Sequence, residues 1–261
     1  MTDQTVSPPS PIPEIRLIDR RDIGAALRLG LADFLAAPWY GLFFAGFYVA
    51  GGLALYFGLF ATGQAFWFVM IAAGFPLFAP FAAVGLYEVS RRREAGEPLS
   101  WGPVLGALRG HGDGQLPVMG VVVLLAFGFW VILARGIFAI FFSHSGIGLD
   151  NLGVLLSGAG VGMVLIGTII GALLALALFS LTVVSLPLLL HREVDFVTAM
   201  ICSLQSVQAN PRTMLSWALL IAALLFLSML PLFLGLLIAL PVLGHASWHL
   251  YRRVLPDDED R

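Results

Sequence analysis

The sequence predicts an all-α integral membrane protein, and three observations predict it. The chain has 261 residues, of which 59% are hydrophobic and 11% are charged, whereas a soluble domain of this size carries about 25% charged residues. The apolar residues come in runs of about 20 or more, long enough to cross a hydrocarbon core of about 30 Å as helices. With the exception of Arg135, the arginines lie outside these runs, most of them near their ends.

The apolar runs differ in length, and the number of helices depends on how the long ones are divided. The runs fall at about 39–61, 66–89, 117–142, 153–190 and 213–251. The first three each fit one helix, with Thr62–Gln64 as the turn between the first two. The fourth is too long for one crossing, so we expect the crossing at about 161–190 and an outer-side segment before it. The fifth contains Pro231 and Pro241 and is either one overlong helix or two short ones.

Arginine placement favours six spans. Arginine-rich loops stay on the cytoplasmic side of a membrane, so we place the N-terminus there. Five helices would then leave Arg252 and Arg253 outside, whereas a sixth, with a turn near Pro231 to Gly235, returns them to the cytoplasm. Of the 14 basic residues, which are all arginine, six spans leave Arg135 as the exception. Both termini are therefore predicted to be cytoplasmic.

A threefold internal repeat is also predicted. Each unit would consist of an amphipathic interfacial helix followed by a two-helix hairpin, with Pro38, Pro117 or Pro211 where the hairpin begins, because proline suits the first turn of a helix. The ends of the first and third hairpins correspond at one constant offset: Pro80, Tyr87, Arg91 and Arg92 match Pro241, Trp248, Arg252 and Arg253. The units cover 22–93, 101–192 and 195–253 in a single membrane domain at 22–254, between a disordered tail at 1–21 and an acidic tail at 255–261.

The three stretches before the hairpins are Asp22–Ala37, Trp101–Leu116 and Asp195–Asn210. In the first, apolar residues recur at helical spacing at Ile23, Leu27, Leu31 and Phe34, and in the third at Val197, Ile201, Leu204 and Val207. Such helices could lie flat with the apolar side in the acyl boundary, or form a cytoplasmic collar packed on the spans. The sequence leaves both arrangements open.

Two histidines are candidate site residues. His245 and His249 stand four apart, on one face of the last helix. Such a pair could bind zinc or copper if further ligands converged, or give one ligand to a haem. His111, His144 and His191 are scattered, however, so we expect no metal and no cofactor. The favoured interpretation is an interfacial cap, in which both imidazoles reach headgroups or loop carbonyls.

Arg135 and Glu88 are the other candidates. Arg135 lies roughly 27 Å along the helix that begins at Pro117, near the outer boundary, where it can snorkel or pair with Asp150. Binding of a ligand or partner is the alternative for Arg135. Glu88 ends the second span directly before three arginines and is expected to pair with one of them, while Asp33 is expected to be solvated on its interfacial helix.

No catalytic residues are predicted. No Ser–His–Asp, Cys–His or paired-carboxylate arrangement is evident in the sequence. Cys202 is the one cysteine, which excludes an intramolecular disulfide. No basic stripe with interleaved aromatic residues suggests a nucleic-acid partner. The predicted surroundings are the lipid bilayer.

The segment 240–252 ends in Gly-His-Ala-Ser-Trp-His-Leu-Tyr-Arg. This string resembles the C-terminal signature of an uncharacterised bacterial family of multi-pass inner-membrane proteins, domain of unknown function family 2189. The stretch 199–214, with Asn210-Pro211 before the fifth span, is also similar to that family. The resemblance covers the chain from the second span onward and implies an inner-membrane protein without an assigned role. Some relatives carry the label of a cytochrome c oxidase subunit, but a haem–copper centre needs several histidines on different helices, which this chain does not provide.

Two functional hypotheses follow. The first is a scaffold, accessory or assembly subunit of a larger membrane complex, because the interior is almost uncharged and the loops are short. The second is a small transporter or channel for an apolar or lipid-like substrate, because repeated hairpins with prolines in the returning helices can line a cavity. A lipid-acting enzyme would need polar residues that converge at one depth. Small residues at 158, 162, 167 and 171 suit helix packing within the chain or in a homo-oligomer.

Overall fold

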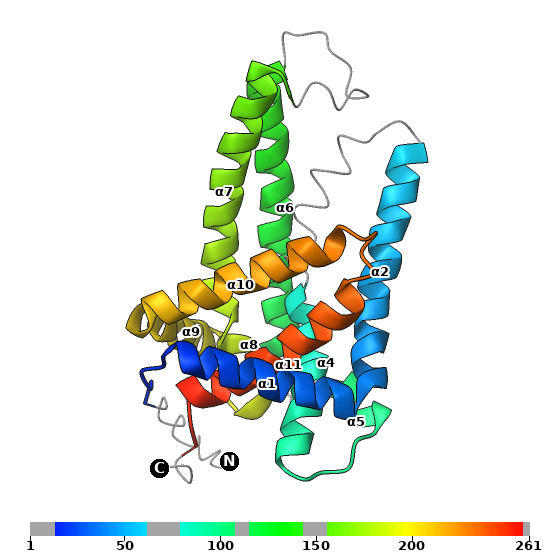
Figure 1. The fold of residues 1–261 in the computed structure, drawn as a ribbon. Helices are drawn as coiled ribbons and strands as arrows, with labels where there is room; N and C mark the ends of the chain where they lie inside the picture. The colour runs from blue at the N-terminus through cyan, green and yellow to red at the C-terminus, as the bar shows by residue number, and fades with distance from the viewer. Residues whose placement is uncertain (1–13, 62–78, 108–114, 143–155, 258–261) are drawn as a thin grey trace, which may run out of the picture.

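The computed structural model describes residues 14–61, 79–107, 115–142 and 156–257. Within these ranges the chain forms helices joined by turns and extended segments, with no β-strand (Figure 1). The all-α fold class is therefore confirmed. Several predictions fall outside the described ranges: the turn at Thr62–Gln64, His111, His144 and Asp150.

The helices follow one another in this order: α1 (Arg20–Ala36), α2 (Pro38–Ala61), α4 (Ala79–Glu94), α5 (Trp101–Gly106), α6 (Gln115–Phe142), α7 (Gly158–Thr182), α8 (Ser185–His191), α9 (Phe196–Ala209), α10 (Pro211–Met229) and α11 (Leu236–Val254). Pro38 and Pro211 begin α2 and α10 as predicted. Pro117 is the third residue of α6, still within the first turn, where its missing N–H leaves no bond unmade.

Four segments of the described chain are long and apolar enough to cross a membrane: Pro38–Gly58, Gln115–Phe142, Gly158–His191 and Pro211–Met229. Several membrane-spanning helices are thereby supported. Of the two further spans predicted, one falls largely within 62–78, outside the described ranges. The other is α11, which is not among these four segments.

The fourth apolar run is divided near its end. α7 stops at Thr182 and α8 begins at Ser185. Pro187 has no N–H to bond the carbonyl of Val183, four residues earlier, so a continuous helix would be interrupted here. The amide of Val184 donates instead to Ser203 Oγ of α9, at 3.1 Å. The break is thus stabilised by a neighbouring helix.

The fifth run forms two helices, with the turn where the arginine placement predicts it. α10 ends at Met229 and α11 begins at Leu236. Leu232 and Phe233 take φ angles of 49° and 64°, in the left-handed region that apolar residues rarely adopt. The turn closes tightly, because a Cβ at Gly235 would lie 2.7 Å from the Cα of Ser228.

α11 is the central helix of the described structure, and α1 runs alongside it (Figure 1). It also packs against α2, α4 and α10. Glycines allow this close approach. A Cβ at Gly30 of α1 would lie 2.5 Å from the backbone nitrogen of Ala246, and one at Gly41 of α2 would lie 2.7 Å from Pro241 Cβ. The polar C-terminal half of α11 is therefore enclosed by protein rather than by lipid.

α1 buries part of the predicted face. The predicted Ile23 and Phe34 are buried, whereas the predicted Leu31 is exposed, and Ala26, Gly30 and Asp33 complete the buried side. The face is rotated because Gly30 is the contact point with α11, and the residues in phase with Gly30 are buried with it. α1 therefore has the collar arrangement, packed on other helices of the chain.

α9 behaves in the opposite way. Its predicted apolar stripe is directed outward, with Ile201 46% exposed. The buried face consists of small residues: Ala199, Cys202, Ser203 and Ser206. Small residues let helix backbones approach closely. The outward stripe leaves an apolar side free to enter the acyl boundary.

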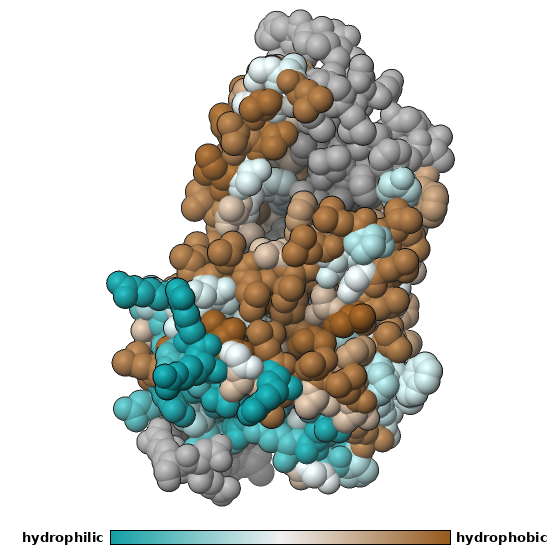
Figure 2. Space-filling model, viewed as in Figure 1, coloured by the Kyte–Doolittle hydropathy of each residue, from teal (hydrophilic) through white to brown (hydrophobic). Residues whose placement is uncertain are grey.

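The two described ends of the chain meet. Residues 14–19 run extended, and the amide of Arg16 donates to the carbonyl of Val254 at 2.9 Å. Asn210, just before α10, accepts from the amide of Ile18 at 2.8 Å and donates to the carbonyl of Arg16 at 3.1 Å. Hydrophilic side chains gather at the end of the molecule where α1 and the C-terminal half of α11 lie, while the surface over α6, α7 and α10 is apolar (Figure 2).

Candidate functional site

Five polar residues from three helices form a cluster with a buried centre at Asp33, Ser90 and His245, which we call the Asp33 cluster. Asp33 comes from α1, Ser90 and Arg93 from α4, and His245 and His249 from α11. Ser90 and Arg93 are three apart and the histidines four apart, so each pair lies on one face of its helix. The two predicted histidines are thus brought together with three residues far away in the sequence.

The carboxylate of Asp33 accepts three hydrogen bonds. Its Oδ1 lies 2.8 Å from Arg93 Nε. Its Oδ2 lies 2.7 Å from Ser90 Oγ and 2.8 Å from His249 Nε2. Burial alone would raise the pKa of Asp33, but the hydrogen bonds from His249, Ser90 and Arg93 outweigh burial and lower the pKa to about 2. Asp33 is therefore ionised at neutral pH.

The hydrogen bonds fix the tautomers of both histidines. His249 carries a proton on Nε2, because the ionised carboxylate of Asp33 can only accept. Ser90 has one hydroxyl proton and donates it to Asp33, so its Oγ accepts from His245, whose Nδ1 lies 2.8 Å away. His245 is therefore assigned its proton on Nδ1. Its Nε2 is buried and has no hydrogen-bond partner among the residues that the structure describes.

The Asp33 cluster contains the serine, histidine and aspartate of a serine-hydrolase triad, but their hydrogen bonds do not run in the order of a triad. In such a triad the histidine takes the serine proton and the aspartate holds the histidine. Here Asp33 accepts from Ser90 itself, which keeps the hydroxyl proton occupied. Ser90 and His245 are also both 0% exposed, so no external substrate reaches them. The arrangement can fasten α1, α4 and α11 together, and it cannot act as a nucleophile.

Two sequence interpretations are corrected by this geometry. His245 and His249 do not cap the interface by reaching headgroups or loop carbonyls, because their ring nitrogens bond to Ser90 and Asp33. Asp33 is not solvated, because it faces the same way as Gly30 and is buried with it. The sequence does indicate the burial of Asp33. It stands three residues after Gly30 and seven after Ala26, so it lies on the same face of α1 as these small residues.

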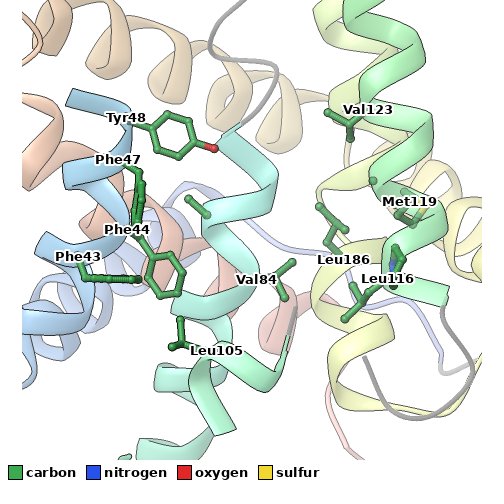
Figure 3. A pocket seen from close by; sticks show the side chains of 13 residues that line it. Phe43, Phe44, Phe47, Tyr48, Val84, Leu105, Leu116, Met119, Val123 and Leu186 are labelled. Carbon is green, nitrogen blue, oxygen red and sulfur yellow. The ribbon is translucent and has the colours of Figure 1, made fainter. Parts of the chain in front are cut away.

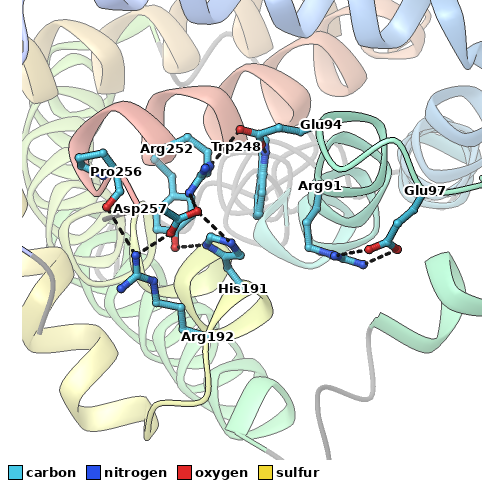
Figure 4. Close-up of polar contacts among 10 residues, drawn as sticks. Arg91, Glu94, Glu97, His191, Arg192, Trp248, Arg252, Pro256 and Asp257 are labelled. Carbon is cyan, nitrogen blue, oxygen red and sulfur yellow. Dashed lines mark hydrogen bonds and ion pairs between the residues drawn. The ribbon is translucent and has the colours of Figure 1, made fainter. Parts of the chain in front are cut away.

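Glu88 pairs with an arginine, as predicted, and in fact with two. Its carboxylate lies 2.8 Å from Arg91 Nε and 2.6 Å from Arg92 Nε. Glu97, in the loop after α4, bonds both arginines in turn, with Arg91 and Glu97 drawn in Figure 4. Glu88 is buried in the second half of α4 and is neutralised within its own helix.

A second polar group joins the ends of α4, α8 and α11 (Figure 4). Glu94 accepts from Trp248 Nε1 at 2.8 Å and from Arg252 Nε at 3.0 Å. Asp257 pairs with Arg252 and, at 2.7 Å, with Arg192. His191 of α8 lies in the same group, with its Nδ1 2.9 Å from the hydroxyl of Tyr251. The C-terminal segment as far as Asp257 is therefore tied to the bundle.

Arg135 lies apart from both polar groups. It is exposed on α6, seven residues before the helix ends at Phe142. Its suggested partner, Asp150, is outside the described ranges. The described residues contain no group of three or more His, Cys, Asp or Glu side chains that could hold a metal ion.

Two apolar cavities lie between the helices. The first, of about 500 Å³, separates α2 and α4 from α6 and is lined by aromatic side chains such as Phe44 and Tyr48 (Figure 3). The second, of about 600 Å³, lies between α7 on one side and α10 and α11 on the other, and we call it the α7–α10 cavity. The charged residues of the two polar groups line neither cavity.

Part of the chain is similar to a known protein family. Residues 68–191 match the family model described as "Predicted integral membrane protein (DUF2189)". No curated protein and no solved structure matches the chain significantly. The matched region runs from the start of the second predicted span to the end of α8, so it precedes the segments 199–214 and 240–252. Over residues 68–191, the chain is therefore similar to DUF2189, a family of predicted integral membrane proteins.

Proposed function

We propose that this protein is a non-catalytic, multi-pass membrane protein that serves as a scaffold, accessory or assembly subunit of a larger membrane complex. One observation carries this proposal. Within the Asp33 cluster, and likewise within the second polar group, the charged side chains pair with one another. Both groups lie at one end of the molecule. They are used to hold the chain's own helices together, and the long apolar helices are left to make external contacts.

The hairpin of α6 and α7 is the proposed contact surface. The two helices run side by side and extend beyond α10 and α11 (Figure 1). The segment Gly158–His191 has only 11% of its most apolar window buried within the protein. Two of its glycines serve the hairpin itself, because a Cβ at Gly162 would meet Phe141 and one at Gly171 would meet Trp130. Gly167 has no neighbouring side chain within 4 Å, and small residues of this kind admit a further helix.

We also propose the six-span topology, in three hairpin units, in a bacterial inner membrane with both termini cytoplasmic. The last helices of the three units, α4, α8 and α11, pack against one another, as related units around a common centre would. The two described ends of the chain meet beside Asn210, near the arginines of the polar end. Reporter fusions after residues 14 and 257 should both be cytoplasmic, and opposite locations would reject this topology.

A second candidate function is transport of an apolar or lipid-like substrate. The two apolar cavities favour it, since cavities of about 500 and 600 Å³ are large enough for small apolar molecules. Flux of a lipid analogue across proteoliposomes that contain the protein would support this function. A rate equal to that of protein-free liposomes would exclude it.

Cross-linking in native membranes tests the scaffold proposal. A photoreactive amino acid at Ile132, exposed on α6, should yield one stoichiometric protein adduct. The matched control is the same photoreactive group at Leu35, which is equally exposed on α1 at the polar end. This control should yield no stoichiometric protein adduct. Absence of a protein adduct at Ile132, together with purification free of any stoichiometric partner, would overturn the scaffold proposal.

A further inference from the structure

We infer that the α7–α10 cavity binds one acyl chain of an anionic glycerophospholipid, whose phosphate lies beside Arg212. The inference is independent of the accessory role proposed above, because a bound lipid is compatible with an accessory subunit as well as with a transporter.

The walls of the cavity are suited to a hydrocarbon chain. They are almost entirely apolar side chains, most of them from α7, α10 and α11, with Ala83 and Tyr87 from α4. The hydroxyl groups in the lining are already used: Thr182 donates to the carbonyl of Leu178 and Ser247 to that of Leu243, each at 2.8 Å, while the hydroxyl of Tyr87 is hydrogen-bonded to Ser247. A cavity of about 600 Å³ with such walls offers water few partners, and an apolar cavity takes an apolar occupant.

The cavity opens toward the surroundings of the helices. Leu173 of α7 and Leu219 of α10 line it, and they are nevertheless 63% and 68% exposed. α7 and α10 both belong to segments able to span the membrane. The mouth between Leu173 and Leu219 therefore faces the hydrocarbon core, so the molecules that reach it are those of the bilayer.

A basic side chain stands where the headgroup of such a lipid would lie. Arg212 is exposed in the first turn of α10, three and seven residues before Leu215 and Leu219, which line the cavity. These spacings place the three residues along one face of the helix. A lipid with its chain between α7 and α10 would have its phosphate near this arginine, and a guanidinium group pairs well with phosphate. Charge complementarity thus favours an anionic phospholipid over a neutral lipid.

Cavity filling tests the chain-binding half of the inference. Ala222 lines the cavity, and Ala222→Phe would occupy the space with a ring. Leu227→Phe, on the exposed part of the same helix outside the cavity, is the matched control. After purification in mild detergent, native mass spectrometry should detect one phospholipid per chain in the wild type and in Leu227→Phe, and none in Ala222→Phe. Equal retention in all three proteins would mean annular lipid only and would overturn the inference, as would no retention in the wild type.

A second variant keeps the test decisive if Ala222→Phe misfolds. Ala175 lines the same cavity from α7, so Ala175→Phe fills it from the opposite wall. If Ala222→Phe does not fold, Ala175→Phe should lose the lipid while keeping the melting temperature of the wild type within a few degrees. Retention of the lipid by a folded Ala175→Phe would reject the cavity as the site.

Substitution of Arg212 tests the headgroup half. Phosphatidylglycerol and diacylglycerol are titrated separately into delipidated protein, so that the same chains are compared with and without a phosphate. Arg212→Gln should weaken binding of phosphatidylglycerol about fivefold, the effect of one arginine near a membrane surface, and leave diacylglycerol unchanged. An equal effect on both lipids, or none on either, would overturn the assignment of the phosphate to Arg212.

Discussion

His249 Nε2 on α11 lies 2.8 Å from the carboxylate of Asp33 on α1, although the two residues are 216 positions apart in the chain. The pair joins the first described helix to the last. Ser90 and Arg93 bond to the same carboxylate from α4, so three helices share one ionised group. A buried charge is costly unless it is paired and hydrogen-bonded, which makes these helices interdependent.

Asp33→Asn should therefore destabilise the protein. The substitution keeps the shape of the side chain but removes the buried charge that accepts hydrogen bonds from Ser90, Arg93 and His249, for which we expect a loss of about 2–4 kcal/mol. Thermal unfolding in detergent would measure it. Glu97→Gln is the control, because the ion pairs of Glu97 are solvent-exposed and such pairs contribute little. Equal melting temperatures of the two variants would contradict the role given to Asp33.

The stability of the protein should fall in acid because of Asp33. Its pKa is lowered from 3.8 to about 2 in the folded protein, so its contribution is complete above about pH 4 and disappears as the pH falls toward 2. The contribution is roughly 2.5 kcal/mol. Unfolding by denaturant at a series of pH values would reveal it as a step between pH 4 and 2. The step should be absent in Asp33→Asn, and its persistence there would assign it to another group.

Gly30→Ala should separate α1 from α11. The added Cβ would lie 2.5 Å from the backbone of Ala246, which cannot move as a flexible side chain does, so we expect a loss of about 1–3 kcal/mol. Gly24→Ala on the same helix is the matched control, since nothing lies within 4 Å of its Cβ. Alanine favours helices over glycine by about 1 kcal/mol, so the control should be neutral or stabilising. A stabilising effect at both positions would argue against the close contact.

The tautomer of His245 is open to direct measurement. Nitrogen-15 NMR of the imidazole should show the proton on Nδ1, because Ser90 Oγ accepts from it. Ser90→Ala should remove this constraint, while Ser216→Ala, on the exposed side of α10, should leave the signal unchanged. A proton on Nε2 in the wild type would mean that Ser90 donates to His245 instead of to Asp33.

Much of the helix order could be predicted from the sequence. Prolines mark the first turns of α2, α6 and α10, because the missing N–H is harmless there. The arginine pair at the end of α11 requires a turn in the preceding apolar run, and the chain turns between Met229 and Leu236. The ion pair of Glu88 follows from its spacing to Arg91 and Arg92, which is a local property.

The faces that pack could not be predicted in the same way. In water an apolar stripe marks the buried side of a helix, but beside lipid the apolar side can point outward and the small residues pack. Both α1 and α9 bury small residues, with Gly30 buried on α1 while Ile201 is exposed on α9. The Asp33 cluster could not be predicted for a related reason. Its hydrogen bonds join α1, α4 and α11, and these helices present the bonding side chains to one another only when the correct faces are buried.

The central place of α11 also determines when the fold can be completed. Helices of membrane proteins are inserted in order of synthesis and associate afterwards. Among the described helices α11 is made last, yet Gly30, Gly41 and the carboxylate of Asp33 all contact it. The surfaces of α1, α2 and α4 that pack against α11 therefore stay uncovered until it is made. A chain that stops before residue 236 would lack His249, so the carboxylate of Asp33 would lose one of its hydrogen-bond donors, and quality-control proteases could distinguish such unfinished copies from finished ones.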